Sequence, residues 1–560
     1  MSVTRGASVN AGWPDFKGVV GHIAASLRDG LGRKGMATGA IARSPLPSAL
    51  VAQAKSALDF LRGAQWDLRL FAPVRHDAAL LSTYLIRRLK MKFRPTFFAA
   101  STALAAFALA ASLAAQASPS AHAAAAQSLA QPVEQFIADF SAAYAELGLG
   151  GEMDLSYRKN IQHIVQHTDV ALQQRRLDQL GQQLKALDGQ ASSTCQALQL
   201  RQIAFELALN QQKLRLLKAF LALGPQAVLS DQGLAKTSLG KDWYAYLRLA
   251  WLTMDSTPEA LMALGQSELD RALTRYRDLQ ARMGYAGRDQ AFAVYLAGPN
   301  FSYPDGQTPQ VDYEVRQARV YRNLHKLFLP TAIAPPLIRR SDLGSALPVD
   351  GYYEPAESTF YFNQAQASYG RRNIDWLLLH ESTPGHHYQS RYALEQRGCP
   401  VGLPHGFYSA FAEGWGAYVE EFGSELGLFQ QDSDALGAVE WDLVRSIRVV
   451  LDVGINALDW TEQEAQDYWR SKLPMLPHLA QREIARVRNW PAQAITYKQG
   501  AVMLRQLREA ARVREGAAFD IRVFHDKVLK HGPLPLALLA EMVEGVAQTA
   551  GPNQAPSLVQ

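Results

Sequence analysis

The chain has 560 residues, of which 48% are hydrophobic and 19% are charged, a balance that fits one large or two ordinary globular domains and argues against a disordered chain. The formal net charge is +5, but residues 1–90 carry a surplus of eight positive charges, which leaves a net charge of −3 on the rest of the chain. The basic isoelectric point therefore belongs to the first ninety residues, and the charge distribution favours no nucleic-acid partner.

Residues 91–117 have the three parts of a secretory signal peptide. A short basic start with Lys92 and Arg94 precedes an Ala- and Leu-rich apolar run, which ends in Ala-Gln-Ala at 115–117. This order predicts a periplasmic or secreted protein with a mature N-terminus near Ser118 or Ala124. An internal transmembrane helix is the disfavoured alternative, because the run is short and rich in Ala rather than Leu or Ile. No cysteine follows the run, so we expect neither a lipid anchor nor stable membrane association after cleavage.

The position of this signal suggests a domain plan for the whole chain. Since a signal peptide belongs at the N-terminus, we expect Met91 to be the true start and residues 1–90 to be a poorly ordered upstream extension. An Ala/Ser/Gln/Pro-rich linker over 118–132, a helical domain over 133–548 and a flexible tail over 549–560 complete the prediction.

The domain is predicted to be mostly α-helical. Apolar residues recur at spacings of three and four over 133–147, 170–222 and 256–283, which is typical of amphipathic helices packed on a core. Thr257-Pro258 marks the start of the third of these segments, because Pro is favoured in the first helical turn. The aromatic, β-prone stretch 346–363 is the exception. It predicts either a structural hairpin or an edge strand that could hold an extended peptide.

The two cysteines, Cys195 and Cys399, are too far apart in sequence to form a Cys-x-x-Cys metal or redox motif. The sequence leaves open whether they form one disulfide or remain two buried thiols.

The strongest chemical signal follows the β-prone stretch. An apolar helical run ends in His380-Glu381, and a histidine pair, His386 and His387, comes shortly after. In zinc peptidases of the His-Glu-x-x-His type, two histidines one helical turn apart bind the metal, and the Glu acts as general base on a water molecule. Here Pro384 occupies the place of the second histidine.

Pro384 decides which histidine we expect to bind the metal. Because it lacks an N–H and its ring clashes with the carbonyl one turn earlier, the helix must break or bulge there. A bulge that absorbs two residues returns His386 to the face of His380. On an unbroken helix His387 would share that face, but it would lie about 10 Å along the axis, too far for one ion. We therefore predict His386 as the ligand, with His387 pointing toward substrate or a neighbouring ligand.

Glu413 is the predicted third ligand. It lies in residues 407–422, a helical pattern whose buried aromatic face makes an unpaired carboxylate costly unless a cation binds it. The alternative is that Glu413 pairs with a buried arginine such as Arg448. We interpret Glu420 and Glu421 as a solvated end of the same helix.

Four motifs in order resemble the bacterial family known as "domain of unknown function 885". They are His-Glu-Ser-Thr-Pro-Gly-His-His-Tyr-Gln at 380–389, Glu-Gly-Trp-Gly-Ala-Tyr at 413–418, and the segments 448–461 and 490–500. The similarity runs from roughly residue 130 to 545. It implies a large helical fold related to thermolysin-like and carboxypeptidase Taq-like zinc peptidases. The β-prone stretch 346–363 adds a small β-hairpin or sheet near the active site.

The resemblance also carries two departures. Asn456 stands where the family tends to have His, so an amide takes the place of a group that can hold a proton, and this puts full activity in doubt. Ala492 stands where Gly is usual, which is a milder change.

The resemblance implies hydrolysis of peptide bonds, and the histidine and carboxylate pattern predicts one Zn²⁺ ion per chain. Glu381 is the expected general base, Tyr497 the expected donor to the oxyanion and Asn456 its assistant. His405 and Tyr408, with His387, are expected to line the substrate cleft.

Two rival functions remain open. One is a catalytically impaired binding protein of the same fold, motivated by Asn456. The other is a zinc-dependent amidase or esterase acting on non-peptide substrates. A serine hydrolase is disfavoured because the chain has no convincing Gly-x-Ser-x-Gly nucleophile elbow. The exact substrate, exo- or endo-cleavage and the oligomeric state cannot be predicted from the sequence.

Overall fold

The computed structural model describes residues 132–149, 157–304, 307–343, 349–364, 369–395 and 408–545. The expected extension, signal peptide and tail lie outside the described residues, as do linker residues 118–131, His405 and Cys399. Within the described part, Cys195 is disulfide-bonded.

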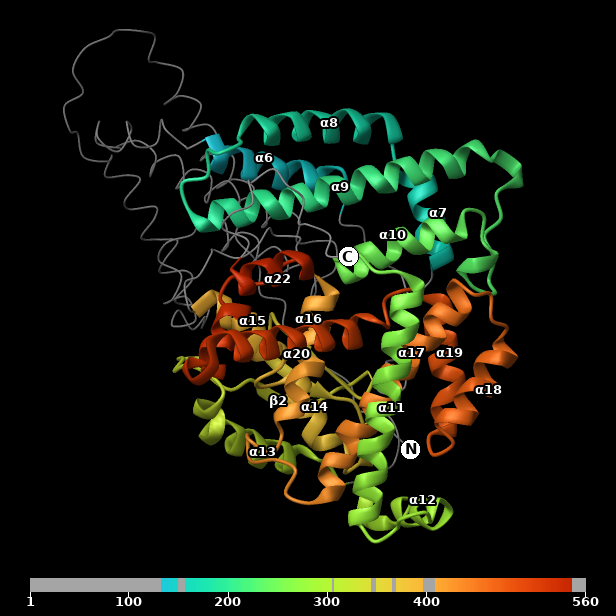
Figure 1. Cartoon of the computed structure of the whole chain (residues 1–560), viewed down its shortest axis with the longest axis vertical. Coiled ribbons are helices and arrows are strands. Elements are labelled where there is room, and N and C mark those ends of the chain that lie inside the picture. Colours follow the sequence, from blue (N-terminus) through green and yellow to red (C-terminus); the bar gives the residue numbers. More distant parts are fainter. Residues whose placement is uncertain are drawn as a thin grey trace, which may run out of the picture. The chain divides into compact units, whose positions relative to one another are not determined.

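Helices dominate the described residues, as the sequence predicts (Figure 1). The N-terminal helices are α6 (Pro132–Glu146), α7 (Tyr157–His167), α8 (Val170–Ala186), α9 (Thr194–Ala222), α10 (Gly240–Leu252), α11 (Pro258–Arg282), α12 (Asp289–Leu296) and α13 (Gln310–Asn323). The C-terminal helices are α14 (Asn373–Glu381), α15 (His386–Glu395), α16 (Ser409–Val419), α17 (Asp432–Asn456), α18 (Glu462–Lys472), α19 (Ala480–Asn489), α20 (Thr496–Glu515), α21 (Ile521–Leu529) and α22 (Leu536–Glu544).

Helix signals in the sequence coincide with observed helix ends. The predicted segment 256–283 forms α11, where the Thr257 side chain accepts from the Ala260 N–H at 3.1 Å and Pro258 occupies the first turn. This cap satisfies one of the N–H groups that have no partner inside the helix. The segment 170–222 forms two helices, α8 and α9, because the chain turns between them and Ser193 caps the second.

The β-prone stretch forms part of a small mixed sheet. β3 (Gly351–Glu354) and β4 (Thr359–Phe362) make an antiparallel hairpin, and β2 (Leu337–Arg340) pairs parallel with β4 in the order β2-β4-β3. A second, two-stranded sheet joins β1 (Ser302–Tyr303) to β5 (Tyr369–Gly370). The hairpin was predicted and β2 was not. β3 lies at an edge of its sheet, beside α14.

The leucine stripes of the sequence lie in the core. The α6, α8 and α9 helices lie side by side (Figure 1) and enclose one apolar cluster, in which Leu200 and Ile203 are fully buried. A second cluster joins α11, α17, α18 and α19, and a third surrounds α14, α16 and α20. Four of the predicted site residues stand on this last group of helices: His380 and Glu381 on α14, Glu413 on α16 and Tyr497 on α20. His386 and His387 lie on α15, and Asn456 lies on α17.

Two helix crossings bring backbones into close contact. A Cβ placed on Gly265 of α11 would lie 2.9–3.1 Å from side-chain atoms of Val449 and Val450 on α17. A Cβ on Gly414 of α16 would lie 2.5 Å from the Cα of Gly500 on α20. Since real Cβ contacts are longer, these positions require glycine for the helices to approach this closely.

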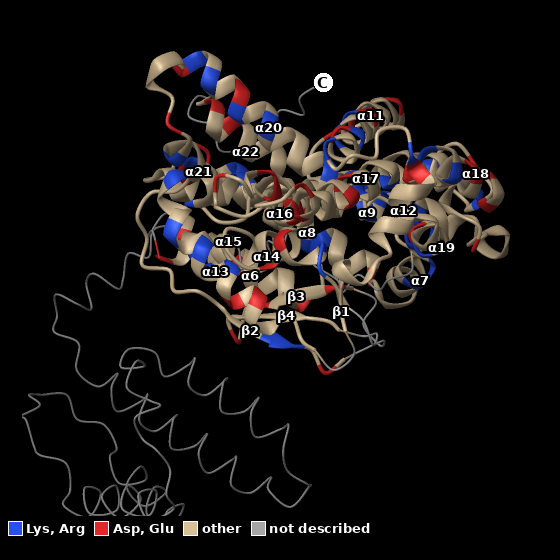
Figure 2. Ribbon diagram, turned by 90° about the horizontal axis from the view of Figure 1, so that it is seen from below, with Lys and Arg blue, Asp and Glu red and all other residues tan. Residues whose placement is uncertain are grey.

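The outer helices mix both signs of charge. Figure 2 shows Lys and Arg interspersed with Asp and Glu along α11, α18 and α20. In the part of the chain that the structure describes, no helix is both long and apolar enough to cross a membrane.

Candidate metal centre

The predicted break after His380-Glu381 is confirmed. α14 ends at Glu381 and α15 begins at His386, with Pro384 and Gly385 in the connection. Three contacts hold this connection in place. The Trp415 indole donates to the Pro384 carbonyl at 2.8 Å, the Tyr321 hydroxyl lies 2.9 Å from the Thr383 hydroxyl, and the Gln389 N–H donates to the Gly385 carbonyl at 2.9 Å. The break is therefore anchored by α13, α15 and α16 rather than being loose.

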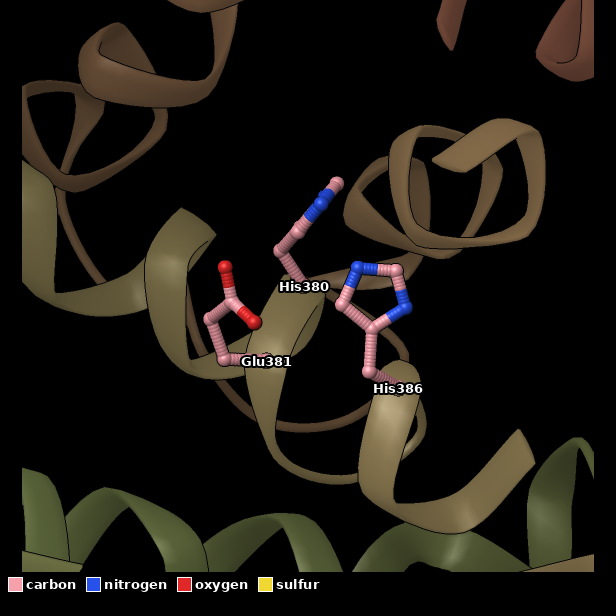
Figure 3. A group of neighbouring side chains, drawn as sticks. All are labelled: His380, Glu381 and His386. Atoms are coloured by element: carbon pink, nitrogen blue, oxygen red, sulfur yellow. The ribbon is translucent and has the colours of Figure 1, made fainter. Parts of the chain in front are cut away.

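The break brings His386 to His380. Their imidazole rings lie 4.7 Å apart between centroids at an angle of 81°. Figure 3 shows the two rings beside each other. Each of His380, Glu381 and His386 offers one potential ligand atom within 4.8 Å of the others.

His387 points elsewhere. Its Nδ1 lies 3.0 Å from the Tyr353 hydroxyl and its Nε2 lies 2.8 Å from the Ala334 carbonyl oxygen. The side chain is almost fully buried between these partners, and this burial lowers the pKa of His387 to about 4. A role in positioning Tyr353 fits this environment better than the predicted contact with substrate.

Glu413 lies between the two histidines. Its Oε2 is 3.2 Å from His380 Nε2 and 3.4 Å from His386 Nε2. The alternative pairing with Arg448 is wrong, because Arg448 donates to Glu483 at 2.6 Å. Burial raises the pKa of Glu413, but hydrogen bonds from both histidines outweigh it and hold the pKa well below its usual range.

Glu420 is the site residue that the sequence interpretation missed. We expected it at a solvated helix end, but it is 4% exposed, and its Oε1 lies 2.7 Å from His380 Nδ1. Its Oε2 accepts from Arg445 Nη1 at 2.5 Å. A carboxylate on the far nitrogen of a histidine fixes the tautomer and the orientation of the ring, so Nε2 faces Glu413. Glu421 is also not simply solvated, since it accepts from Arg505 at 3.1 Å.

Gly416 makes room for the His380 ring. A Cβ at this position would lie 2.5 Å from Cε1 and 2.7 Å from Nδ1 of His380. The Glu-Gly-Trp-Gly motif therefore supplies a carboxylate, Glu413, and, at Gly416, the space that the His380 imidazole occupies.

Glu381 is buried next to the edge strand. Burial raises the pKa of its carboxyl group, partly offset by His386 and His380, and the backbone N–H of Tyr353 on β3 faces the same carboxylate. A carboxylate with a raised pKa close to a histidine pair suits a group that accepts and returns a proton.

Tyr497 completes the group from α20. Its ring stacks on the His380 ring at 6.2 Å between centroids, and its hydroxyl accepts from Arg486 Nη2 at 3.3 Å. Burial raises the pKa of Tyr497, Glu413 raises it further, and Arg486 lowers it. The neutral hydroxyl is therefore available as a donor beside the histidines.

Asn456 does not belong to this group. Its amide oxygen accepts from the Leu234 N–H at 3.0 Å, and its amide nitrogen donates to the Val487 carbonyl at 3.1 Å. Because both ends of the amide are bonded to backbone, the expected role beside an oxyanion is wrong. At Ala492, φ is +66°, which explains why Gly is favoured at that position.

Tyr408 is also placed differently from the prediction. It is 4% exposed, and its hydroxyl donates to Glu206 on α9 at 3.1 Å. A Tyr408 side chain held in the core this way cannot line an open cleft.

The chain belongs to the family described as "Bacterial protein of unknown function (DUF885)", whose model matches residues 44–543. The matched range begins ahead of Met91, and the expected start at Met91 stays a prediction.

Two solved structures are similar to the chain. One, described as a "putative lipoprotein" from Colwellia psychrerythraea, is 24% identical, covers 67% of this chain and 70% of its own, and has a TM-score of 0.53. The other, described as a "putative lipoprotein of unknown function" from Shewanella oneidensis, is 17% identical, covers 95% and 93%, and has a TM-score of 0.48. The first likeness concerns the fold alone. Comparison with curated proteins gave no match.

Proposed function

We propose that the protein is a zinc-dependent hydrolase of peptide bonds, with one ion held by His380, His386 and Glu413. The observation that carries the proposal is the spacing of the three ligand atoms. Glu413 Oε2 lies 3.2 Å from one imidazole nitrogen and 3.4 Å from the other. Ligands about 2.0–2.1 Å from a tetrahedral zinc ion are about 3.3 Å from one another.

The charges also fit a cation. Two carboxylates meet His380, one on each nitrogen, and outweigh the effect of burial, so the pKa of His380 is raised to about 10. A metal ion would take the place of that proton, because ligands bind in their deprotonated forms. Three protein ligands leave a fourth position for water or substrate, as in catalytic zinc sites.

The chemistry divides among the residues as follows. Zinc, when bound, polarises a carbonyl group and lowers the pKa of a water molecule to about 7. Glu381 takes a proton from the attacking water and passes it to the amine as the C–N bond breaks. Tyr497 donates its hydroxyl proton in a hydrogen bond to the oxygen that becomes negative.

The edge strand supports a peptide as substrate. β3 pairs with β4 along one edge only. The backbone N–H of Tyr353, near the C-terminal end of β3, faces Glu381. An extended peptide placed along such an edge would pass the general base. The rival function, an impaired binding protein, was suggested by Asn456 in a catalytic position. Because Asn456 is bonded to backbone groups, that argument no longer applies. A periplasmic or secreted location belongs to the proposal and rests on residues 91–117.

The deciding experiment measures hydrolysis of a peptide library by the zinc-loaded protein, the chelator-treated protein and Glu381→Gln. We expect hydrolysis that chelation abolishes and zinc restores. Glu381→Gln should retain one zinc per chain, because the base does not bind the metal. It should lose activity by roughly 10²- to 10⁴-fold, because the general base is missing. Full activity of zinc-loaded Glu381→Gln would refute the assigned base, and failure of the native chain to bind zinc would refute the metal centre.

A further inference from the structure

An arginine cluster borders the proposed centre on the side of Tyr497. The guanidinium carbons of Arg445, Arg448 and Arg486 lie 5.6, 5.8 and 5.7 Å from the centre of the Tyr497 ring. Three cationic side chains therefore surround one phenol ring next to the histidine pair. Whether one of these arginines is free to bind an anion depends on which of them already has a carboxylate partner.

Two of the three arginines are neutralised within the protein. Arg445 donates to Glu420, and Arg448 donates to Glu483. Glu483 also accepts from Arg482 at 2.9 Å, so two arginines share this carboxylate. Glu420 and Glu483 are thus the two carboxylates that pair with this cluster, and each is already bonded by an arginine.

Arg486 is the member with no carboxylate partner among the residues that the structure describes. Its Nη2 donates to Gln493 at 2.9 Å and to the Tyr497 hydroxyl at 3.3 Å, and both acceptors are neutral. Its Nε is buried without a hydrogen-bond partner. Arg445 and Arg488 also have a buried, unbonded Nε, but each of them pairs with a glutamate.

Other carboxylates in this region are engaged or set apart. The charges of Glu483 and Glu413 both act on Arg486, but neither carboxylate forms an ion pair with it. Glu483 pairs with Arg448 and Arg482, and Glu413 is hydrogen-bonded to both histidines. Asp350, directly before β3, is buried, which raises the pKa of its carboxyl group, and the charge of Arg482 offsets part of this rise. A partly buried guanidinium that has no carboxylate bonded to it, beside the proposed substrate site, is an arrangement that a carboxylate ligand would complete.

We propose that Arg486 binds a carboxylate group of the substrate, within one or two residues of the bond that is cleaved. This inference rests on the proposed function. The position follows from the contacts: Arg486 bonds the Tyr497 hydroxyl, and the Tyr497 ring stacks on His380. Arg486 is therefore separated from the metal centre by about the length of one phenol ring. Successive Cα atoms of a peptide are about 3.8 Å apart, so this separation corresponds to one or two residues of the substrate.

The carboxylate has two possible sources, the C-terminus of the peptide or an Asp or Glu side chain. Both present two oxygens to the fork of a guanidinium. A C-terminal carboxylate would make the protein a carboxypeptidase, and a side-chain carboxylate would make it selective for acidic residues.

The test measures binding, so that it does not depend on turnover. The full chain carrying Glu381→Gln is loaded with zinc and titrated by calorimetry with three N-acetylated peptides of one sequence. The first ends in a free carboxylate and the second in a carboxamide. The third ends in a carboxamide and has Glu in place of the last residue. We expect a carboxylate-bearing peptide to bind about 10- to 100-fold more tightly than the second peptide. The first or the third identifies the source.

The matched variants are Arg486→Gln and Arg488→Gln, each in the Glu381→Gln background. Arg488 lies two residues further along α19, and its partner is Glu462 at 2.7 Å. Preference for a carboxylate should vanish with Arg486→Gln and persist with Arg488→Gln. Arg486→Lys should keep part of it, because the charge remains. Thermal unfolding of each variant shows whether its fold is intact.

Equal affinity for all three peptides in the parent protein would overturn the proposal, whatever the variants do. A preference that survives Arg486→Gln would also overturn it. Failure of the proposed function has a different signature, since the native protein would then hydrolyse no peptide while the binding preference remained.

Discussion

Gly416→Ala tests the metal centre by steric means, without removing any ligand. The added Cβ would lie 2.5, 2.7 and 2.9 Å from Cε1, Nδ1 and Nε2 of His380. Ordinary contacts between carbon atoms are about 3.5–4.0 Å, so the imidazole must move by about 1 Å. The ring cannot move freely, because Glu420 holds Nδ1 and Tyr497 covers one face.

The expected loss can be set from this displacement. Metal sites tolerate deviations of about 0.2 Å in ligand position, and disturbing the orientation of one ligand histidine costs about 10- to 100-fold in affinity. We expect Gly416→Ala to lower zinc affinity by about 100-fold or more, at or beyond the upper end of that range. Overpacking costs about 1–3 kcal/mol, partly offset by the higher helix propensity of Ala, so the zinc-free protein should still fold.

The assay is competition for zinc with a chromophoric chelator, combined with thermal unfolding in the absence of metal. Gly181→Ala on α8 is the matched control. A Cβ on Gly181 would lie no closer than 3.9 Å to a neighbouring atom, Nε2 of Gln211. The substitution should leave zinc affinity unchanged and stabilise the fold by up to about 1 kcal/mol. If folded Gly416→Ala bound zinc as tightly as the native protein, His380 would not be a ligand in the observed position.

Three further predictions follow from the same structure. Glu420→Gln should lower zinc affinity by about 10- to 100-fold in equilibrium dialysis, because the charge that orients His380 is lost, and unchanged affinity would exclude this role. His386→Ala should lose the metal and His387→Ala should keep it, as measured by metal content after gel filtration; the reverse order would refute the helix-break assignment. Burial lowers the pKa of His525 to about 3, below its value of about 6.5 in the unfolded chain, so its contribution to stability is present above pH 6.5 and is lost as the pH falls. The free energy of unfolding should therefore fall by about 1.4 kcal/mol per pH unit more steeply in the native protein than in His525→Gln between pH 6 and 4; equal slopes in denaturant titrations would contradict this.

Local signals in the sequence predicted much of the fold. The cap at Thr257, the break at Pro384 and the apolar spacing of α6, α9 and α11 depend on neighbours within one or two turns. Such signals survive folding because tertiary contacts reinforce them rather than compete with them. The buried carboxylate of Glu413 could also be predicted, since its apolar neighbours made it costly without a partner.

Long-range pairings could not be predicted in this way. Glu420 meets His380 across 40 residues, and its sequence neighbours gave it the pattern of a helix end. β2 was missed because its partner, β4, lies about twenty residues away and pairs in parallel. Asn456 was assigned by its position in a motif, whereas its contacts with Leu234 and Val487 follow from the packing of α17. In each case the deciding partner is distant in the chain.

The crossing of α16 and α20 has a consequence for how this site can change over generations. Glu413 directly precedes Gly414, and Tyr497 lies one turn before Gly500, so the backbone contact sets the separation of the two functional side chains. In most tight helix pairs, a larger residue on one side can be compensated by a smaller one on the other. Here both members are already glycine, so no smaller partner remains. The pair is mutationally locked: neither residue can grow unless the helices move apart and carry Glu413 and Tyr497 with them.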